Sequence, residues 1–392
     1  MPSDSIPAFD SPSHNQPSTG PADQALEQCL RDLVTEPMTE TAVSDQSQRD
    51  KSHQFLATQL LSQTWQVQAF GLTPDRAAAR VEQRLQRLRA LHPILSQFCQ
   101  TQLGWSSYSL VHCWQLWLPL AEQLLIWQDD LQRPLIQGIL GGQGTGKTTL
   151  TRLLATILSQ LGRSVAYLSI DDLYKTYAER QQLQRLDPRF SWRGPPGTHD
   201  VELGLNLLQQ LRQSQFPVAI PRFDKSLHGG AGDRTQAERI ERADILLFEG
   251  WFVGVRPIDP ARFATAPSPI VTAADREFAQ TVNRQLQAYL PLWDLLDRWL
   301  LLYPTNYRFS QQWRWQAEQQ MQAAGRTGMS AAAVNEFVEY FWRALHPELF
   351  VKPLLGSEAV DLVVELGESH QIGAIYCPRA EASAGSRARS SC

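Results

Sequence analysis

The chain has 392 residues, of which 43% are hydrophobic, and its formal net charge is −4. This length allows two domains or one domain with a large extension, and the charge gives no reason to expect a nucleic-acid-binding surface. No apolar stretch reaches membrane-spanning length, so no membrane partner is expected.

Both ends of the chain are predicted to be disordered. Residues 1–50 are polar, contain many Pro and Ser, and show no sustained periodicity, and residues 378–392 are small and polar. The first 20 residues contain no Arg or Lys, unlike a secretion signal or an Arg-rich transit peptide. The five cysteines are scattered without metal-ligand spacing, which favours reduced thiols. These features predict a cytoplasmic protein.

Residues 51–130 are predicted to form a helical N-terminal region. Helical spacing of apolar residues is seen in His53–Phe70, Pro74–Leu91 and Leu110–Leu131. This region carries five tryptophans, namely Trp65, Trp105, Trp114, Trp117 and Trp127. Aromatic residues at helical spacing usually belong to a core, and a partner-binding or oligomer surface is the alternative. The sequence does not indicate an oligomeric state.

Residues 131–377 alternate between short apolar runs and helical patterns. The expected strands are Leu135–Leu140, Val165–Ile170, Ile245–Phe248, Trp299–Tyr303 and Val360–Leu366. The expected helices are Lys147–Leu161, Asp200–Gln213, Glu277–Leu290, Ser310–Ala324 and Ser330–Leu345. Continuous apolar runs are typical of parallel strands that are covered on both faces. The sequence therefore predicts a three-layer α/β fold around a parallel sheet, of the P-loop NTPase type, with the helical region as an N-terminal extension.

A phosphate-binding loop lies between the first expected strand and the first helix. Its residues are Gly141, Gly142, Gln143, Gly144, Thr145, Gly146, Lys147, Thr148 and Thr149, which match Gly-x-x-x-x-Gly-Lys-[Ser/Thr]. Such a loop turns backbone N–H groups toward a β-phosphate at the positive end of a helix. Lys147 is expected to reach the β- and γ-phosphates, and the Thr148 hydroxyl to bind Mg²⁺. The chain is therefore predicted to bind a nucleoside triphosphate.

Two acidic positions follow expected strands. Asp171 and Asp172 come directly after the second strand, and Glu249 ends the third. Ligands of such sheets bind at the carboxyl ends of the strands. A carboxylate there could take the proton of an acceptor alcohol, and another could hold Mg²⁺. A helix cap or a solvated strand end is the alternative for each.

Two polar, glycine-rich loops and a late helix offer cations. The loops run from Trp192 to Asp200 and from Pro221 to Arg234, and their Arg and Lys side chains could bind a carboxylate or phosphate. Asp200 could instead cap the following helix. Arg308, Arg314 and Arg326 lie in or beside a late helix that could form a lid over the transferring phosphoryl group.

From Pro134 to Leu345, the order and spacing of these motifs resemble the D-glycerate 3-kinases, photorespiratory enzymes within the phosphoribulokinase, uridine kinase and pantothenate kinase group. The segments that carry the resemblance include Gly141–Thr149, Ser169–Tyr174, Arg193–Asp200, Pro221–Ser226, Phe248–Trp251 and Trp313–Glu318.

The resemblance implies an ATP-dependent kinase that uses Mg²⁺ and phosphorylates the 3-hydroxyl of D-glycerate. It implies that Asp171 is the catalytic base, that Lys147 and Arg314 act on the phosphoryl group, and that Thr148 and Glu249 hold the metal. It also implies an acceptor site lined by Arg193, His199, Asp200, Arg222 and Lys225. A kinase for uridine, pantothenate or ribulose 5-phosphate, or a regulatory nucleotide-binding protein, remains an alternative.

Overall fold

The computed structural model describes residues 20–35, 43–62, 64–323 and 328–378. Its centre is a six-stranded sheet with the strand order β10-β9-β8-β1-β7-β2. The strands are β1 (Leu135–Gly141), β2 (Val165–Ser169), β7 (Ile245–Gly250), β8 (Arg298–Pro304), β9 (Leu362–Leu366) and β10 (Ile372–Tyr376). The first five pair in parallel, as predicted, whereas β10 is antiparallel to β9 and was not expected.

The sheet separates two hydrophobic cores because alternate residues of each strand face opposite sides. Leu135 and Ile139 of β1 belong to one core, and Ile136 and Leu140 belong to the other. Every residue of β1 and β7 is buried. Burial on both faces explains why the strands read as continuous apolar runs, and it confirms the three-layer fold.

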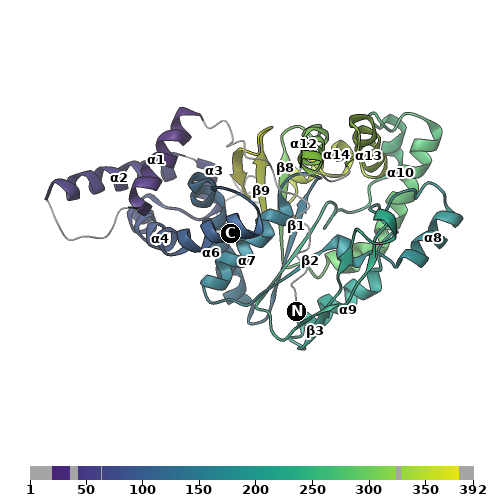
Figure 1. Ribbon diagram of the computed structural model, residues 1–392, viewed down its shortest axis with the longest axis horizontal. Helices are drawn as coiled ribbons and strands as arrows, with labels where there is room; N and C mark the ends of the chain where they lie inside the picture. Colours follow the sequence, from purple (N-terminus) through teal and green to yellow (C-terminus); the bar gives the residue numbers. More distant parts are fainter. Residues whose placement is uncertain (1–19, 36–42, 63, 324–327, 379–392) are drawn as a thin grey trace.

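Helices cover both faces of the sheet (Figure 1). The main helices of this part are α7 (Lys147–Gln160), α8 (Tyr177–Leu186), α9 (Val201–Arg212), α10 (Ala273–Gln285), α12 (Phe309–Ala323) and α13 (Ala331–Ala344). The shorter α11 (Leu290–Trp293) and α14 (Pro347–Phe350) complete the set. α7 packs in the first core, and α9, α10 and α13 pack in the second. The helix predictions are therefore confirmed to within a few residues, except that α8 was missed.

The N-terminal helices lie on the same side of the sheet as α7. They are α1 (Pro21–Thr35), α2 (Val43–Ser62), α3 (Thr64–Ala69), α4 (Ala77–Gln102), α5 (Leu110–His112) and α6 (Leu118–Leu131), with a π-helical turn at Cys113–Trp117. Trp114, Trp117 and Trp127 are buried in the first core, and Trp105 packs against it. The core interpretation holds for these four; the side chain of Trp65 lies outside the described residues.

The expectation that residues 1–50 are disordered is wrong for the described part. α1 buries Leu26, Leu30 and Leu33, and α2 already begins at Val43. The three leucines recur at helical spacing, so they form one apolar stripe that packs into the core shared with α4. The rest of the predicted disordered ends, residues 1–19, 36–42 and 379–392, lies outside the described residues.

Two short antiparallel ribbons shape the polar loop after α9. One pairs β3 (Val218–Ile220) with β6 (Glu238–Ile240), and the other pairs β4 (Phe223–Asp224) with β5 (Asp233–Arg234). They fold the predicted loop from Pro221 to Arg234 back on itself. Within the described ranges, no helix combines the length and the apolar character needed to cross a membrane.

Candidate active site

The P-loop connects β1 to α7 through left-handed backbone. Gly144 and Gly146 both have a φ of +75°, which glycine adopts readily and other residues rarely do. Gly146 is the N-cap of α7, so the first N–H groups of this helix have no acceptor within the helix. The ammonium of Lys147 lies 3.5 Å from the carbonyl oxygen of Gly142. Amides and ammonium together suit a polyphosphate.

Glu249 lies beside the P-loop helix, at the carboxyl end of β7. Its Oε1 accepts a hydrogen bond of 3.0 Å from the hydroxyl of Thr148, and its side chain is only 4% exposed. Burial raises the pKa of Glu249, although the nearby Lys147 ammonium opposes the shift. Oε2 is buried and has no hydrogen-bond partner among the described residues. A buried carboxylate oxygen without a partner, next to a hydroxyl, suits a divalent cation.

A metal ion at this position would need further ligands. No group of three or more His, Cys, Asp or Glu side chains in the described part of the chain is placed to hold a metal. Mg²⁺ is usually held by one or two protein oxygens together with water and phosphate oxygens, so the pair Thr148 and Glu249 fits that requirement.

Asp171 follows β2, which is the neighbour of β7 in the sheet. Residue Ser169 of β2 pairs with Glu249 of β7, so the two carboxylates lie at the same edge. The Lys225 ammonium is 2.8 Å from Oδ2 of Asp171. Burial favours the neutral acid, but the Lys225 charge and hydrogen bonds from Lys225 and Tyr174 hold the pKa of Asp171 well below its usual range. Asp171 is therefore an ionised group that can accept a hydrogen bond from an alcohol.

His199 is buried beneath this group. Its ring stacks on Tyr174 with centroids 4.6 Å apart, and its Nδ1 lies 2.8 Å from the hydroxyl of Tyr289. Burial lowers the pKa of His199 to about 3, so the ring is neutral. Its Nε2 is buried without a hydrogen-bond partner among the described residues. An unpartnered buried nitrogen can serve a ligand.

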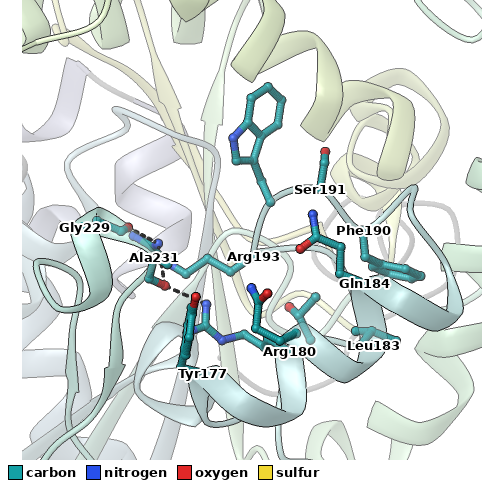
Figure 2. Close-up of a pocket in the computed structure, with 13 residues that line it drawn as sticks. Tyr177, Arg180, Leu183, Gln184, Phe190, Ser191, Arg193, Gly229 and Ala231 are labelled. Atoms are coloured by element: carbon teal, nitrogen blue, oxygen red, sulfur yellow. Dashed lines mark hydrogen bonds between the residues drawn. The ribbon is translucent and has the colours of Figure 1, made fainter.

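Arg193 lines a cavity of about 310 Å³ (Figure 2). Its Nη1 donates to the carbonyl oxygens of Gly230 at 2.7 Å and Ala231 at 3.1 Å. Arg180 of α8, which sequence reasoning missed, donates to the same Ala231 oxygen at 2.7 Å. The glycine-rich loop from Pro221 to Arg234 thus holds two arginines in place through its backbone carbonyl groups.

Asp200 and Arg222 are both engaged in ion pairs with other residues of the chain. Asp200 caps α9 by accepting from the Leu203 N–H at 3.0 Å, and its other oxygen pairs with Arg234 at 2.9 Å. This bears out the alternative that Asp200 is a helix cap. Arg222 pairs with Asp172 at 3.0 Å and also with Glu238. These contacts hold the loops together, and a substrate-binding role for Asp200 and Arg222 stays a prediction.

The predicted lid arginines lie in different surroundings. Arg314 of α12 pairs with the buried Glu318, and its guanidinium lies over the ring of Phe337. Arg308 lies over the ring of Tyr307, and Arg326 lies outside the described residues. A catalytic role for Arg314 stays a prediction, because its guanidinium would have to leave Glu318 to reach a phosphate.

Sequence reasoning also missed Tyr174 and Tyr289. Tyr174 belongs to the same motif as Asp171, Ser169–Tyr174, so the sequence could have identified it as a site residue. Tyr289 stands 90 residues from His199, and no local pattern links the two.

Comparisons with known proteins bear on the fold and the family of the chain. The model of the "Phosphoribulokinase / Uridine kinase family" matches residues 136–284. The "Uncharacterized kinase mug58" of Schizosaccharomyces pombe is 35% identical over 218 residues, which are 53% of this chain and 79% of that protein. The chain belongs to the phosphoribulokinase and uridine kinase family. Membership in the family implies that the kinase uses ATP, typically with Mg²⁺, and acts on a small molecule.

Two relatives of this kinase are named D-glycerate 3-kinase. The chloroplastic D-glycerate 3-kinase of Arabidopsis thaliana is 29% identical over 313 residues, covering 74% of this chain and 66% of that protein. The solved structure of D-glycerate 3-kinase from Cryptococcus neoformans is 26% identical with a TM-score of 0.61, covering 67% of this chain and 99% of that one.

Proposed function

We propose that this kinase transfers the γ-phosphoryl group of ATP to the 3-hydroxyl of D-glycerate, giving 3-phosphoglycerate and ADP. The observation that carries the proposal is the Asp171 carboxylate, which lies at the same edge of the sheet as Glu249 and 2.8 Å from the Lys225 ammonium. A small hydroxy acid needs a carboxylate to orient its hydroxyl and a cation to hold its acid group. The similarity to two proteins named D-glycerate 3-kinase supports this choice of acceptor.

The phosphate side of the reaction would rest on four side chains. Lys147 and the N–H groups of the P-loop would bind the β- and γ-phosphates, which holds the leaving oxygen in line with the acceptor. Thr148 and Glu249 would hold Mg²⁺, which when bound supplies positive charge to the phosphate oxygens. Arg314 would add charge to the transferring group after release from Glu318.

The acceptor side would rest on Asp171. The 3-oxygen of glycerate would form a bond to the γ-phosphorus as the bond to the ADP oxygen breaks, and Oδ of Asp171 would take the hydroxyl proton. Its lowered pKa makes Asp171 a weak base. A weak base is sufficient here because the transition state of phosphoryl transfer is loose and the proton leaves late.

The cavity beside Arg193 offers less to a nucleoside than to a small acid. A nucleoside needs a ring face on which its base can stack. Three aromatic residues line the cavity, and each already contacts another ring: Tyr177 stacks on His228, Phe190 packs on Phe278, and Trp192 packs on Phe337 and Tyr340.

A panel of acceptors tests the proposal. Purified protein with ATP and Mg²⁺ should release ADP faster with D-glycerate than with uridine, pantothenate or ribulose 5-phosphate. The product should carry phosphate on the 3-oxygen. A product phosphorylated on the 2-oxygen, or stimulation by another acceptor alone, would reject the assignment. Absence of stimulation by every acceptor would favour a regulatory nucleotide-binding protein. The Lys147→Ala variant, which should fold but not turn over, controls for contaminating kinases.

A further inference from the structure

Tyr289 contacts two groups of the segment before α9 through its hydroxyl. Its oxygen accepts a hydrogen bond of 2.9 Å from the backbone N–H of Gly197, and it lies 2.8 Å from Nδ1 of His199. A backbone N–H can only donate, so the Tyr289 oxygen is the hydrogen-bond acceptor in the first contact. The direction of the second hydrogen bond decides which nitrogen of the His199 ring carries the proton.

The Tyr289 hydroxyl is held in place and stays protonated. Tyr289 ends a 3₁₀ turn (Leu286–Tyr289) and is only 1% exposed. Its ring packs on Phe252 and Trp293, with centroids 5.2 and 5.8 Å apart. Burial raises the pKa of Tyr289, and hydrogen bonds from the backbone oppose this shift only in part. The phenol therefore brings one proton, and a buried proton of this kind needs a hydrogen-bond acceptor.

His199 is held opposite this hydroxyl as a neutral ring. Its backbone forms an antiparallel bridge with that of Tyr174, on whose ring it also stacks. The charged groups that face the ring are Asp171, Lys175 and Arg180. Asp171 favours a charged imidazolium, but burial and the two cations oppose it, so the pKa of His199 falls and the ring has a single proton.

The two possible positions of this proton leave different numbers of buried groups without a partner. With the proton on Nδ1, that nitrogen would donate to Tyr289. The Tyr289 proton would then lack an acceptor among the described residues, and Nε2 would be a buried lone pair without a donor. With the proton on Nε2, Tyr289 donates to Nδ1, and the Nε2–H alone lacks a partner. The second arrangement is favoured because each unpartnered buried polar group destabilises the fold.

We infer that Tyr289 is a positioning residue that holds the proton of His199 on Nε2, so that His199 presents a hydrogen-bond donor to the site and cannot act as a base. Asp171 is then the group that takes the hydroxyl proton. Tyr289 and Gly197 place the proton whatever the acceptor alcohol is, whereas the effect on turnover rests on the proposed function.

NMR of the full chain with isotope-labelled histidine detects the proton directly. His199 should give the signals of a neutral ring with its proton on Nε2, and His199→Gln identifies these signals by their absence. His346 is the internal reference: its Nδ1 accepts from the Glu348 N–H at 3.2 Å and its Nε2 lies 3.0 Å from the Ser268 carbonyl oxygen, which also places the proton on Nε2. A proton on Nδ1 of His199, or a charged ring, would overturn the assignment whether or not the protein phosphorylates D-glycerate.

Tyr289→Phe removes the hydroxyl and keeps the ring. The Nδ1 signal of His199 should move toward that of a nitrogen without a hydrogen bond, and the His346 signals should stay in place. With D-glycerate as acceptor, kcat should fall by roughly 2- to 10-fold, the range for loss of one hydrogen bond, with KM for ATP unchanged. The wild-type kcat–pH profile should show no limb near about 6.5, the ordinary pKa of histidine.

Tyr303→Phe is the matched control, because it removes the hydroxyl of a half-buried tyrosine on β8 and should keep the wild-type kcat. Thermal melting checks that each variant folds. A fall in kcat without a change in the His199 signals would show a structural role for Tyr289 and overturn its positioning role, and so would an unchanged kcat. If wild-type protein does not phosphorylate D-glycerate, the proposed function fails, and the NMR spectrum still decides where the proton lies.

Discussion

Asp171 and Glu249 have the same functional group and lie at the same edge of the sheet, yet their surroundings differ. Lys225 holds Asp171 in its ionised form, whereas Glu249 faces the hydroxyl of Thr148 and keeps one buried oxygen without a partner. An ionised carboxylate can orient an alcohol, and a carboxylate with an unfilled oxygen can bind a cation. Substitutions of the two residues should therefore change different kinetic quantities.

Asp171→Asn keeps the size of the side chain and removes the proton acceptor. We expect kcat to fall by roughly 10²- to 10⁴-fold while the Mg²⁺ concentration for half-maximal rate stays nearly constant. Glu249→Gln should instead raise that Mg²⁺ concentration. Rate measurements over a Mg²⁺ series distinguish the two. If Asp171→Asn shifts the Mg²⁺ requirement and Glu249→Gln does not, the roles are reversed.

Lys225 controls the pH range in which Asp171 is ionised. Burial alone would raise the pKa of Asp171, and the Lys225 ammonium is the main group that lowers it. Because the ionised form is the active one, activity is lost as pH falls through this pKa. Lys225→Met should therefore move the acidic limb of the kcat–pH profile to higher pH. Lys225→Arg keeps the charge and should leave the limb in place; an unmoved limb in Lys225→Met would contradict the assignment.

At the scale of elements, the turn between β9 and β10 contacts the P-loop. His370 in this turn lies 2.7 Å, through its Nε2, from the carbonyl oxygen of Gly144, and its ring stacks on Trp313 of α12. A Cβ at Gly144 would lie 2.6 Å from Cβ of Trp313, so α12 packs tightly on the same loop. Two elements distant in sequence thus fix the shape of the phosphate-binding loop.

The effect of this contact can be measured with His370→Ala. Loss of one hydrogen bond to the loop should raise KM for ATP by roughly 2- to 10-fold and leave KM for D-glycerate unchanged. His53→Ala, a histidine on α2 far from the loop in sequence, is the matched control. An equal rise in both KM values, or none, would show that His370 does not position the P-loop.

Burial decides which strands and helices could be predicted from the sequence. The five parallel strands were predictable because burial on both faces leaves continuous apolar runs, and their ends then brought Asp171 and Glu249 together. α8 was not predictable because none of its residues is buried, so it carries no apolar stripe. The ion pairs of Asp200 and Arg222 could not be predicted because their partners are distant in sequence: Arg234 is 34 residues from Asp200, and Glu238 and Asp172 are 16 and 50 residues from Arg222.

At the scale of the whole molecule, the N-terminal helices and the P-loop helix share one core. Leu85 and Leu88 of α4 belong to the same hydrophobic cluster as Leu150 and Leu154 of α7, and α4 and α6 both contact α7. Helices that share a core with the P-loop helix should unfold together with it, because neither part can bury its apolar face alone.

Leu85→Ala tests this coupling. Leu85 is fully buried, so the substitution should leave a cavity and lower the free energy of unfolding by about 2–5 kcal/mol. Denaturant unfolding should show one transition with a lower midpoint, and ATP with Mg²⁺ should shift that same transition upward, because the ligand binds only the folded state. Gln86→Ala changes an exposed neighbour and should stay within about 0.5 kcal/mol of wild type. If Leu85→Ala instead displaces a separate early transition that ATP does not affect, residues 51–130 fold as an independent unit, and their packing on α7 does not support the phosphate-binding loop.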